Sequence, residues 1–549
     1  MIDMNVRRAL IIFALLLGIA AIALFNLTQN SIVTAAAPSD SLHKTRPIQL
    51  SVIAQVGPWP VASRLIGYRG RLWFANSVKG RNHNSADIWS LDPATGSKRY
   101  ERHLFSQDAG LPLVSKGLLY WPFEDALLSF GNGVVEVTDG ETWQPLVIPN
   151  APIYHTSQLL EWQGGLLAIT GTRNAGMQFS KDAGRSWEEL YIHPTPSTHV
   201  SRLKEMLVFD GKTYASLKDT KVKRLTRWTG AGFQTVNSWP ANRYFNGLTV
   251  HKSALFGIVG RGGEREIWKF DGSRSVRVGF KGPFTDLTSD GEQLWMVARD
   301  GRLWSSTDGE KWIRHGDLKN GKPVSIQAIS KGIYVAGAGD DGRGIVWGAL
   351  GHTIANVTKA AGLTPQRPTK LATMNWQEAG EKVDRLLSDP STYGSSGGGQ
   401  LRTLVSEAVA QGAPSGFFAK RLKTKIPSIK ISAFGGNMEL KAQDIGRSIL
   451  LSAMETAGHP NVPVTYLLDP WGSAPNSYEK YFELELSALR AVAGSGQNDD
   501  ATIDALLARL DFSDDPPWLK SQIIGTLTAV SGEHFGYDVA AWRKWAQLK

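Results

Sequence analysis

Cysteine is absent from this chain of 549 residues. Its absence excludes disulfides, thiolate nucleophiles, cysteine-ligated zinc and iron–sulfur clusters, and an N-terminal lipid anchor built on a modified cysteine. The eleven histidines form neither an H-E-x-x-H nor an H-x-H pair. We therefore predict no catalytic residue, no metal ligand and no cofactor. We expect a protein without enzymatic activity, although the sequence alone leaves that question open.

Long runs of one charge are also missing, although the formal net charge is +10. A basic balance favours an anionic partner such as lipid head groups, acidic polysaccharide or nucleic acid. Because no run holds five or more basic residues, we do not expect nucleic acid to be the partner.

One long apolar run stands at the N-terminus. Arg7 and Arg8 precede an uncharged stretch from Ala9 to Phe25. Seventeen apolar residues are at the short end for spanning a bilayer as a helix, and the arginines are expected to stay in the cytoplasm. We predict a transmembrane helix within residues 1–30, a tether over 31–47 and an extracytoplasmic remainder, periplasmic or at the cell surface. A signal peptide cleaved near Ala35-Ala36-Ala37 is the alternative.

Glycine and tryptophan are abundant, at 57 and 19 residues, and they recur in a pattern. A turn is followed by a short apolar strand seven times, at intervals of 38–47 residues. The seven copies begin at Gly70, Gly117, Gly164, Gly211, Ser253, Gly291 and Gly332. A second strand follows in each copy, often with a tryptophan, as at Trp89, Trp228, Trp268, Trp304 and Trp347. This period is typical of propeller blades, so we predict a mainly β fold with a seven-bladed β-propeller over residues 48–362. Six or eight blades are the alternatives.

Turns downstream of the second strand carry a further motif. Ser180, Asp182, Gly184 and Trp187 fit S-x-D-x-G-x-x-W. A shorter copy has Ser306, Asp308, Gly309 and Trp312, and Thr138–Trp143 is a degenerate one. These turns resemble the Asp-box, or bacterial neuraminidase repeat, of sialidase-like propellers. The resemblance implies a structural role on the blade rim, with the carboxylate accepting N–H bonds within its own turn.

The C-terminal third has helical periodicity. We expect a linker and first helix over residues 363–399 and an α-helical domain over 400–549. The expected helices are Gln400–Ala410, Ala442–Ala457, Tyr478–Ala493, Ala501–Leu510, Trp518–Val530 and Val539–Gln547. The ending Ser531–Asp538, with Trp542 and Trp545 after it, resembles the last repeat of HEAT-like helical domains. An unrelated helical domain is the alternative.

Two motifs invite a chemical interpretation. Sialidases bind the carboxylate of their substrate with arginines, the first of which lies in an F/Y-R-I-P motif. The stretch nearest to that motif in this chain is Arg64-Leu65-Ile66, which lacks the proline. The sequence Gly337–Gly342 matches G-x-G-x-x-G, but a strand follows it where a dinucleotide site needs a helix, so we expect a hairpin.

We therefore expect a membrane-anchored extracytoplasmic interaction or assembly scaffold that binds an extracytoplasmic or membrane protein through its propeller and helical surfaces. One version of this scaffold hypothesis is an assembly factor that resembles the photosystem assembly propellers, and it predicts a basic face on the propeller. The alternative is a carbohydrate-binding or glycoside-hydrolysing propeller with envelope polysaccharide as ligand. That alternative predicts arginine, carboxylates and aromatic side chains converging at the central mouth, and small apolar residues there would argue against it.

Overall fold

A computed structural model describes residues 48–354, 375–468 and 483–549, apart from short internal gaps of which 79–85, 125–132 and 149–154 are the longest. The predicted membrane segment, tether and cleavage site lie outside these residues. Within the described ranges, no helix is both long and apolar enough to cross a bilayer.

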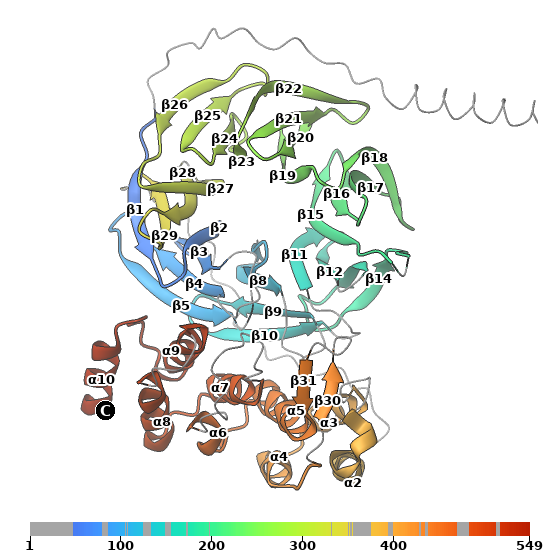
Figure 1. Ribbon diagram of the computed structural model, residues 1–549, viewed down its shortest axis with the longest axis vertical. Coiled ribbons are helices and arrows are strands. Elements are labelled where there is room, and N and C mark those ends of the chain that lie inside the picture. The colour runs from blue at the N-terminus through green and yellow to red at the C-terminus, as the bar shows by residue number, and fades with distance from the viewer. Residues whose placement is uncertain are drawn as a thin grey trace, which may run out of the picture.

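The first part of the chain folds into seven blades arranged in a ring (Figure 1). Blade 1 contains β2 (Val61–Tyr68), β3 (Arg71–Ser77), β4 (Ala86–Leu91) and β5 (Lys98–Leu104). Blade 2 contains β6 (Asp108–Ala109), β7 (Leu113–Ser115), β8 (Leu118–Glu124), β9 (Gly133–Thr138) and β10 (Trp143–Ile148). Blade 3 contains β11 (His155–Trp162), β12 (Gly165–Gly171), β13 (Ala175–Ser180) and β14 (Glu188–Ile192). Blade 4 contains β15 (Arg202–Phe209), β16 (Lys212–Lys218), β17 (Val222–Trp228) and β18 (Phe233–Pro240).

The remaining blades complete the circle. Blade 5 contains β19 (Tyr244–His251), β20 (Ala254–Arg261), β21 (Glu264–Phe270) and β22 (Ser275–Gly282). Blade 6 contains β23 (Phe284–Ser289), β24 (Leu294–Ala298), β25 (Arg302–Ser306) and β26 (Ile313–Asp317). Blade 7 contains β27 (Gly321–Ile329), β28 (Gly332–Gly339), β29 (Gly344–Gly348) and β1 (Ser51–Val56). The predicted count of seven is therefore confirmed.

The ring closes through strands from both ends of the propeller. β1 is the outermost strand of blade 7, where it pairs antiparallel with β29 and places Val52 opposite Trp347. The first and last parts of the domain thereby share one sheet, so opening the ring requires breaking that ladder. Gly337–Gly342 lies at the β28–β29 hairpin, as expected.

Side chains between neighbouring blades form the core of the propeller. Trp347 is fully buried and Trp304 is 3% exposed. Trp228 packs edge-on against Tyr191 of the preceding blade, while Trp268 packs against Trp239. A tryptophan at this blade position therefore stabilises the packing of one blade on the next.

The C-terminal part is helical. It contains α2 (Trp376–Ser388), η1 (Pro390–Tyr393), α3 (Gly399–Ala410), α4 (Ser415–Leu422), α5 (Ala442–Ala457), α6 (Thr465–Leu468), α7 (Glu483–Ser495), α8 (Asp500–Leu510), α9 (Pro517–Ser531) and α10 (Val539–Leu548). A two-stranded hairpin, β30 (Lys430–Ala433) and β31 (Met438–Lys441), precedes α5. The helices form two rows, with α3, α5, α7 and α9 contacting one another in one row and α6, α8 and α10 in the other.

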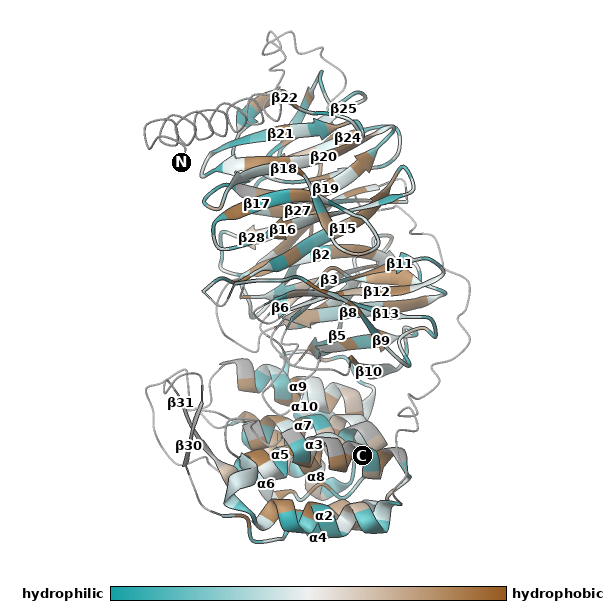
Figure 2. Cartoon of the chain, turned by 90° about the vertical axis from the view of Figure 1, so that its right-hand side faces the viewer, coloured by the Kyte–Doolittle hydropathy of each residue, from teal (hydrophilic) through white to brown (hydrophobic). Residues whose placement is uncertain are grey.

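Figure 2 shows the propeller and the helical domain as two stacked parts of the molecule. α2 lies within residues 363–399, where a first helix was expected. Helices α4 and α6 and the β30–β31 hairpin were not expected from the sequence. α4 and α6 are short, at 8 and 4 residues, and so present too little periodicity to be seen. Asp499 caps the N-terminus of α8, because its carboxylate accepts from the Thr502 N–H.

Candidate functional site in the propeller channel, the blade turns and the domain junction

The inner strands of the propeller share a β-bulge. The register shifts at Thr156/Gln158 in β11, at Leu203/Glu205 in β15, at Phe284/Asp286 in β23 and at corresponding points of β2, β19 and β27. A bulge leaves N–H groups without a partner in their own ladder and turns a side chain to a new direction.

Polar side chains at these bulges bond to the next blade. Gln158 receives a bond of 2.7 Å from the Met206 N–H and donates to the Met206 carbonyl. Glu205 accepts from the N–H groups of Gly247 and Leu248 at 3.2 and 2.7 Å. Each bond pairs backbone groups that the neighbouring bulge leaves unpaired, so these side chains tie adjacent inner strands together.

Asp286 and Arg64 occupy the corresponding places in blades 6 and 1 and line a cavity of about 480 Å³. Asp286 accepts from the Ile326 N–H at 3.1 Å, and Arg64 donates to the Ala109 carbonyl at 3.2 Å. Burial raises the pKa of Asp286 to about 7, with a further rise from the charge of Glu205. Hydrogen bonds from backbone N–H groups and the Arg64 guanidinium oppose that rise. Near neutral pH the carboxyl can therefore both donate and accept.

The other side chains around this cavity are mostly aliphatic. They are Leu65, Ile66, Leu111, Pro112, Ile326, Ala328, Ile329 and Ile354, with Gly67, Ser325, Gln327 and Ser330 beside them. Arginine and carboxylate meet here, as a carbohydrate site would require, but none of the described residues lining the cavity is aromatic. The cavity can hold a small polar group against an apolar wall, but it offers no ring for a sugar to stack on.

The turn at Ser180–Trp187 joins β13 to β14. Asp182 accepts from the Ser186 N–H at 2.8 Å and from the Ser186 hydroxyl at 2.7 Å. The Ser180 hydroxyl donates to Asp182 and accepts from the Gly184 N–H, both at 2.8 Å. Trp187, 8% exposed, folds back so that its indole N–H donates to the Gly184 carbonyl at 3.0 Å. The Ser180 hydroxyl, the Asp182 carboxylate and the Trp187 indole N–H thus all bond within their own turn.

The shorter motif between β25 and β26 has the same geometry. Asp308 accepts from the Glu310 and Lys311 N–H groups at 2.8 and 2.9 Å, and the Trp312 indole donates to the Gly309 carbonyl at 3.1 Å. Ser306 again donates to the carboxylate. Partial burial would raise the pKa of Asp308, but these hydrogen bonds outweigh it and lower the pKa overall.

A buried polar cluster joins the propeller to the helical domain. Asp87, fully buried on β4, accepts from Trp59, Tyr100, His103 and Tyr537 at 3.1, 3.3, 2.6 and 2.5 Å. Burial and the Asp87 charge raise the pKa values of Tyr100 and Tyr537, so both phenols stay protonated donors. Tyr537 reaches Asp87 from a point far along the chain, just before α10. The carboxylate therefore links both domains.

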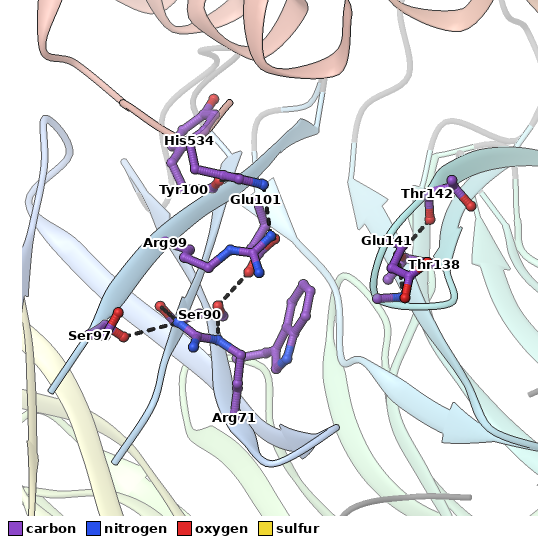
Figure 3. A network of polar contacts seen from close by, with 12 residues as sticks. Arg71, Ser90, Ser97, Arg99, Tyr100, Glu101, Thr138, Glu141, Thr142 and His534 are labelled. Carbon is purple, nitrogen blue, oxygen red and sulfur yellow. Dashed lines mark hydrogen bonds and ion pairs between the residues drawn. The ribbon is translucent and has the colours of Figure 1, made fainter. Parts of the chain in front are cut away.

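A second network crosses the same junction at the surface of blade 1 (Figure 3). Arg71 donates to the Ser90 hydroxyl at 2.7 Å, and Ser90 donates to Glu101. Arg99 lies 3.6 Å from Glu101 and donates to His534 Nε2 at 2.7 Å. His534 Nδ1 also bonds to the Tyr100 carbonyl, so this histidine of the helical domain contacts blade 1 at two points.

Helix α9 lies directly against β5. A Cβ placed on Gly525 would be 2.5 Å from the Cβ of His103, so a side chain has no room at this point. The Tyr100 ring belongs to the same hydrophobic cluster as the helices, and the Tyr537 ring packs edge-on against it. One continuous core therefore spans the junction, and the two domains form one body.

Sequence reasoning missed the bulge side chains and the junction. The bulge side chains are spaced by about one or two blade lengths, at Gln158, Glu205 and Asp286. Because they are of different residue types, the repeat cannot be recognised in the sequence. Asp87 stands one residue before an apolar strand segment and carries no motif. Three-dimensional contact is what makes both sets visible.

Comparison with known proteins does not assign this chain to a family. No family model and no curated protein matches the chain. Among solved structures, the Neurospora crassa Pan2 WD40 domain is 11% identical with a TM-score of 0.41, covering 58% of this chain and 99% of that one. YCF48 from Cyanidioschyzon merolae is 12% identical with a TM-score of 0.39, covering 54% and 98%. BamB from Moraxella catarrhalis is 14% identical with a TM-score of 0.33, covering 57% and 98%. At these values the likenesses carry no information on partner or activity.

Proposed function

We propose that this protein is a membrane-anchored extracytoplasmic scaffold that binds a protein partner. The continuous core at the domain junction carries the proposal, because it fixes a propeller face and a two-row helical surface in one rigid body. A rigid body presents its contact residues without the ordering cost that flexible linkage would add to binding. The apolar run after Arg7 and Arg8 supports the anchor and the extracytoplasmic placement.

Two narrower assignments belong to the same proposal. The turns at Ser180–Trp187 and Ser306–Trp312 are Asp-box turns with a structural role, supported by hydrogen bonds that stay within each turn. The helical domain is a HEAT-like stack, supported by the two rows of contacting helices.

Capture from native membranes tests the scaffold function. The tagged full-length protein is cross-linked in the membrane, solubilised and purified, and its bound proteins are quantified by mass spectrometry. The matched control is the same chain with Gly525→Trp, which removes the fit of α9 on β5 while leaving every exposed residue unchanged. We expect a stoichiometric protein partner with the wild type and less of it with the variant. Recovery of no protein above background would refute the proposal.

Carbohydrate binding in the channel is the second candidate function. The observation in its favour is the meeting of Arg64 and Asp286 at one cavity. Envelope polysaccharide retained by the wild type and lost with Arg64→Met would support it, whereas equal retention by both would reject it.

A further inference from the structure

The positive charge of this protein is concentrated in two adjacent blades. Residues 202–282, which form blades 4 and 5, contain 16 Lys and Arg against 6 Asp and Glu, a net charge of +10. That value equals the net charge of the whole chain, so the other blades, the helical domain and the N-terminal segment are together neutral. Figure 1 shows β19–β22 across the ring from the helices. The excess charge therefore lies away from the domain junction.

Within these blades many of the cations gather at one end, here called the linker end. Because the strands alternate in direction, the connections between the second and third strands of each blade and those between blades lie at the same end of the propeller. The linker end of blades 4 and 5 holds Lys218, Lys221, Lys223, Arg224, Arg243, Arg261, Arg265 and Lys281. Most of these side chains are exposed to solvent.

Like charges are in close proximity there. Lys218 and Lys223 are directly opposite each other on β16 and β17, which is unfavourable for two cations. Arg265 of blade 5 adds a third positive charge, and burial together with these two neighbours lowers the pKa of Lys223. A bound anion would relieve this repulsion.

A cleft of about 490 Å³ opens beside the linker end, between blades 3 and 4. It exists because β14 is only 5 residues long and the chain then leaves the sheet, so the face of blade 4 is not fully covered. Leu217, Val222 and Phe233 give the cleft an apolar side. Lys221 and Arg224 also line it, with Arg224 held at 2.5 Å by Asp219.

An exposed apolar side chain lies on the flank of the same cleft. Val200, on the segment that runs from β14 to β15, is 46% exposed, and its N–H donates to the Thr220 hydroxyl at 2.9 Å, beside the cleft residues Asp219 and Lys221. His193, Pro194, Pro196 and His199 from that segment line the cleft. Cleft and flank together offer apolar contact next to a concentrated positive charge.

We propose that the cleft and the linker end of blades 4 and 5 bind an extended acidic segment of a protein partner. An apolar side chain of the segment enters the cleft beside Phe233, and its carboxylates lie over Lys218, Lys221 and Arg261. The apolar lining and the carboxylate of Asp219 favour a polypeptide over a uniformly anionic polymer, which would place phosphate or sulfate against both. This inference rests on the scaffold function and names the surface and the partner chemistry.

Photo-cross-linking locates the bound segment. In the full-length protein in native membranes, p-benzoylphenylalanine replaces Thr235, an exposed residue that lines the cleft. The matched position is Ser273, an exposed turn residue of blade 5 at the opposite end of the propeller. We expect Thr235 to capture a peptide of net negative charge, and Ser273 not to capture that peptide. Capture of a basic peptide, of lipid or of polysaccharide at Thr235 would overturn the inference.

Charge reversal then measures the contribution of the cations. The captured segment, made as a labelled synthetic peptide, is titrated against full-length protein carrying K218E/K221E/R261E. The control, K181E/K212E/R274E, makes the same change in charge on exposed cations at the other end of blades 3, 4 and 5. We expect roughly tenfold or greater weakening for the first variant, a shallower salt dependence, and less than about twofold change for the control. Equal effects of both variants would overturn the inference.

The two proposals fail in different ways. If the membrane capture described above yields a protein but Thr235 cross-links to none, this surface is wrong and the scaffold function stands. If no protein is captured by either route, the scaffold function itself fails.

Discussion

Replacing Gly525 by alanine has two effects of opposite sign on the free energy of unfolding. Gly525 lies within α9, where alanine is favoured over glycine by about 1 kcal/mol through helix propensity alone. Against β5, however, the new Cβ would lie 2.5 Å from the Cβ of His103 and 3.4 Å from the Tyr100 hydroxyl. Carbon atoms need about 3.5–4 Å, so α9 must move outward by roughly 1 Å. Overpacking of this kind costs about 1–3 kcal/mol.

The packing effect is the larger, so we expect Gly525→Ala to lower the free energy of unfolding by up to about 2 kcal/mol. The assay is denaturant unfolding of the purified full-length protein, followed by tryptophan fluorescence. The matched control is Gly416→Ala in α4, where no atom lies within 4 Å of the added Cβ and the stability should stay level or rise. A stabilisation by Gly525→Ala equal to that of Gly416→Ala would refute direct packing of α9 on blade 1.

Three further changes test other parts of the account. Trp187→Ala should lower the free energy of unfolding by about 3–5 kcal/mol, because a large buried ring leaves a cavity; an unchanged melting temperature would show that the ring is not packed. Asp286 has its pKa raised from 3.8 to about 7, so its stabilising contribution is complete below pH 3.8 and is lost as the pH rises through 7. Asp286→Asn should therefore match the wild type near pH 4 and exceed it by about 2–4 kcal/mol above pH 7.5, and equal melting curves at both pH values would contradict the burial of this carboxyl. Tyr537→Phe removes one donor from the buried Asp87 carboxylate and should cost about 1.5–3 kcal/mol, measured by thermal unfolding, and an unchanged melting temperature would contradict this bond.

Sequence was sufficient for the parts of the fold that repeat. A turn, a short apolar strand and a tryptophan recur once per blade, so positions such as Trp304 and Trp347 marked both the blade count and the core. The longer helices were visible for the same reason, since α5 was expected at Ala442–Ala457 and lies there. Short elements such as α6 carry too few residues for a period to appear.

The candidate sites depended on contacts between distant residues. Asp87 and Tyr537 meet across 450 positions of the chain, and no local pattern links them. Gln158 and Glu205 each accept from a backbone N–H of the next blade. They do so with different functional groups, because an amide and a carboxylate can both accept such a bond. The cleft beside blade 4 depends on where β14 ends, and strand ends are poorly marked in sequence.

Amide hydrogen exchange of the full-length protein, alone and with the captured partner, tests the central claim most directly. The claim is that one rigid scaffold binds a protein through the cleft and the linker end of blades 4 and 5. It predicts added protection in residues 193–201 and 217–224, with the inner strands around Arg64 and Asp286 unchanged. Protection confined to the strands that line the channel, or no added protection in any blade, would contradict it.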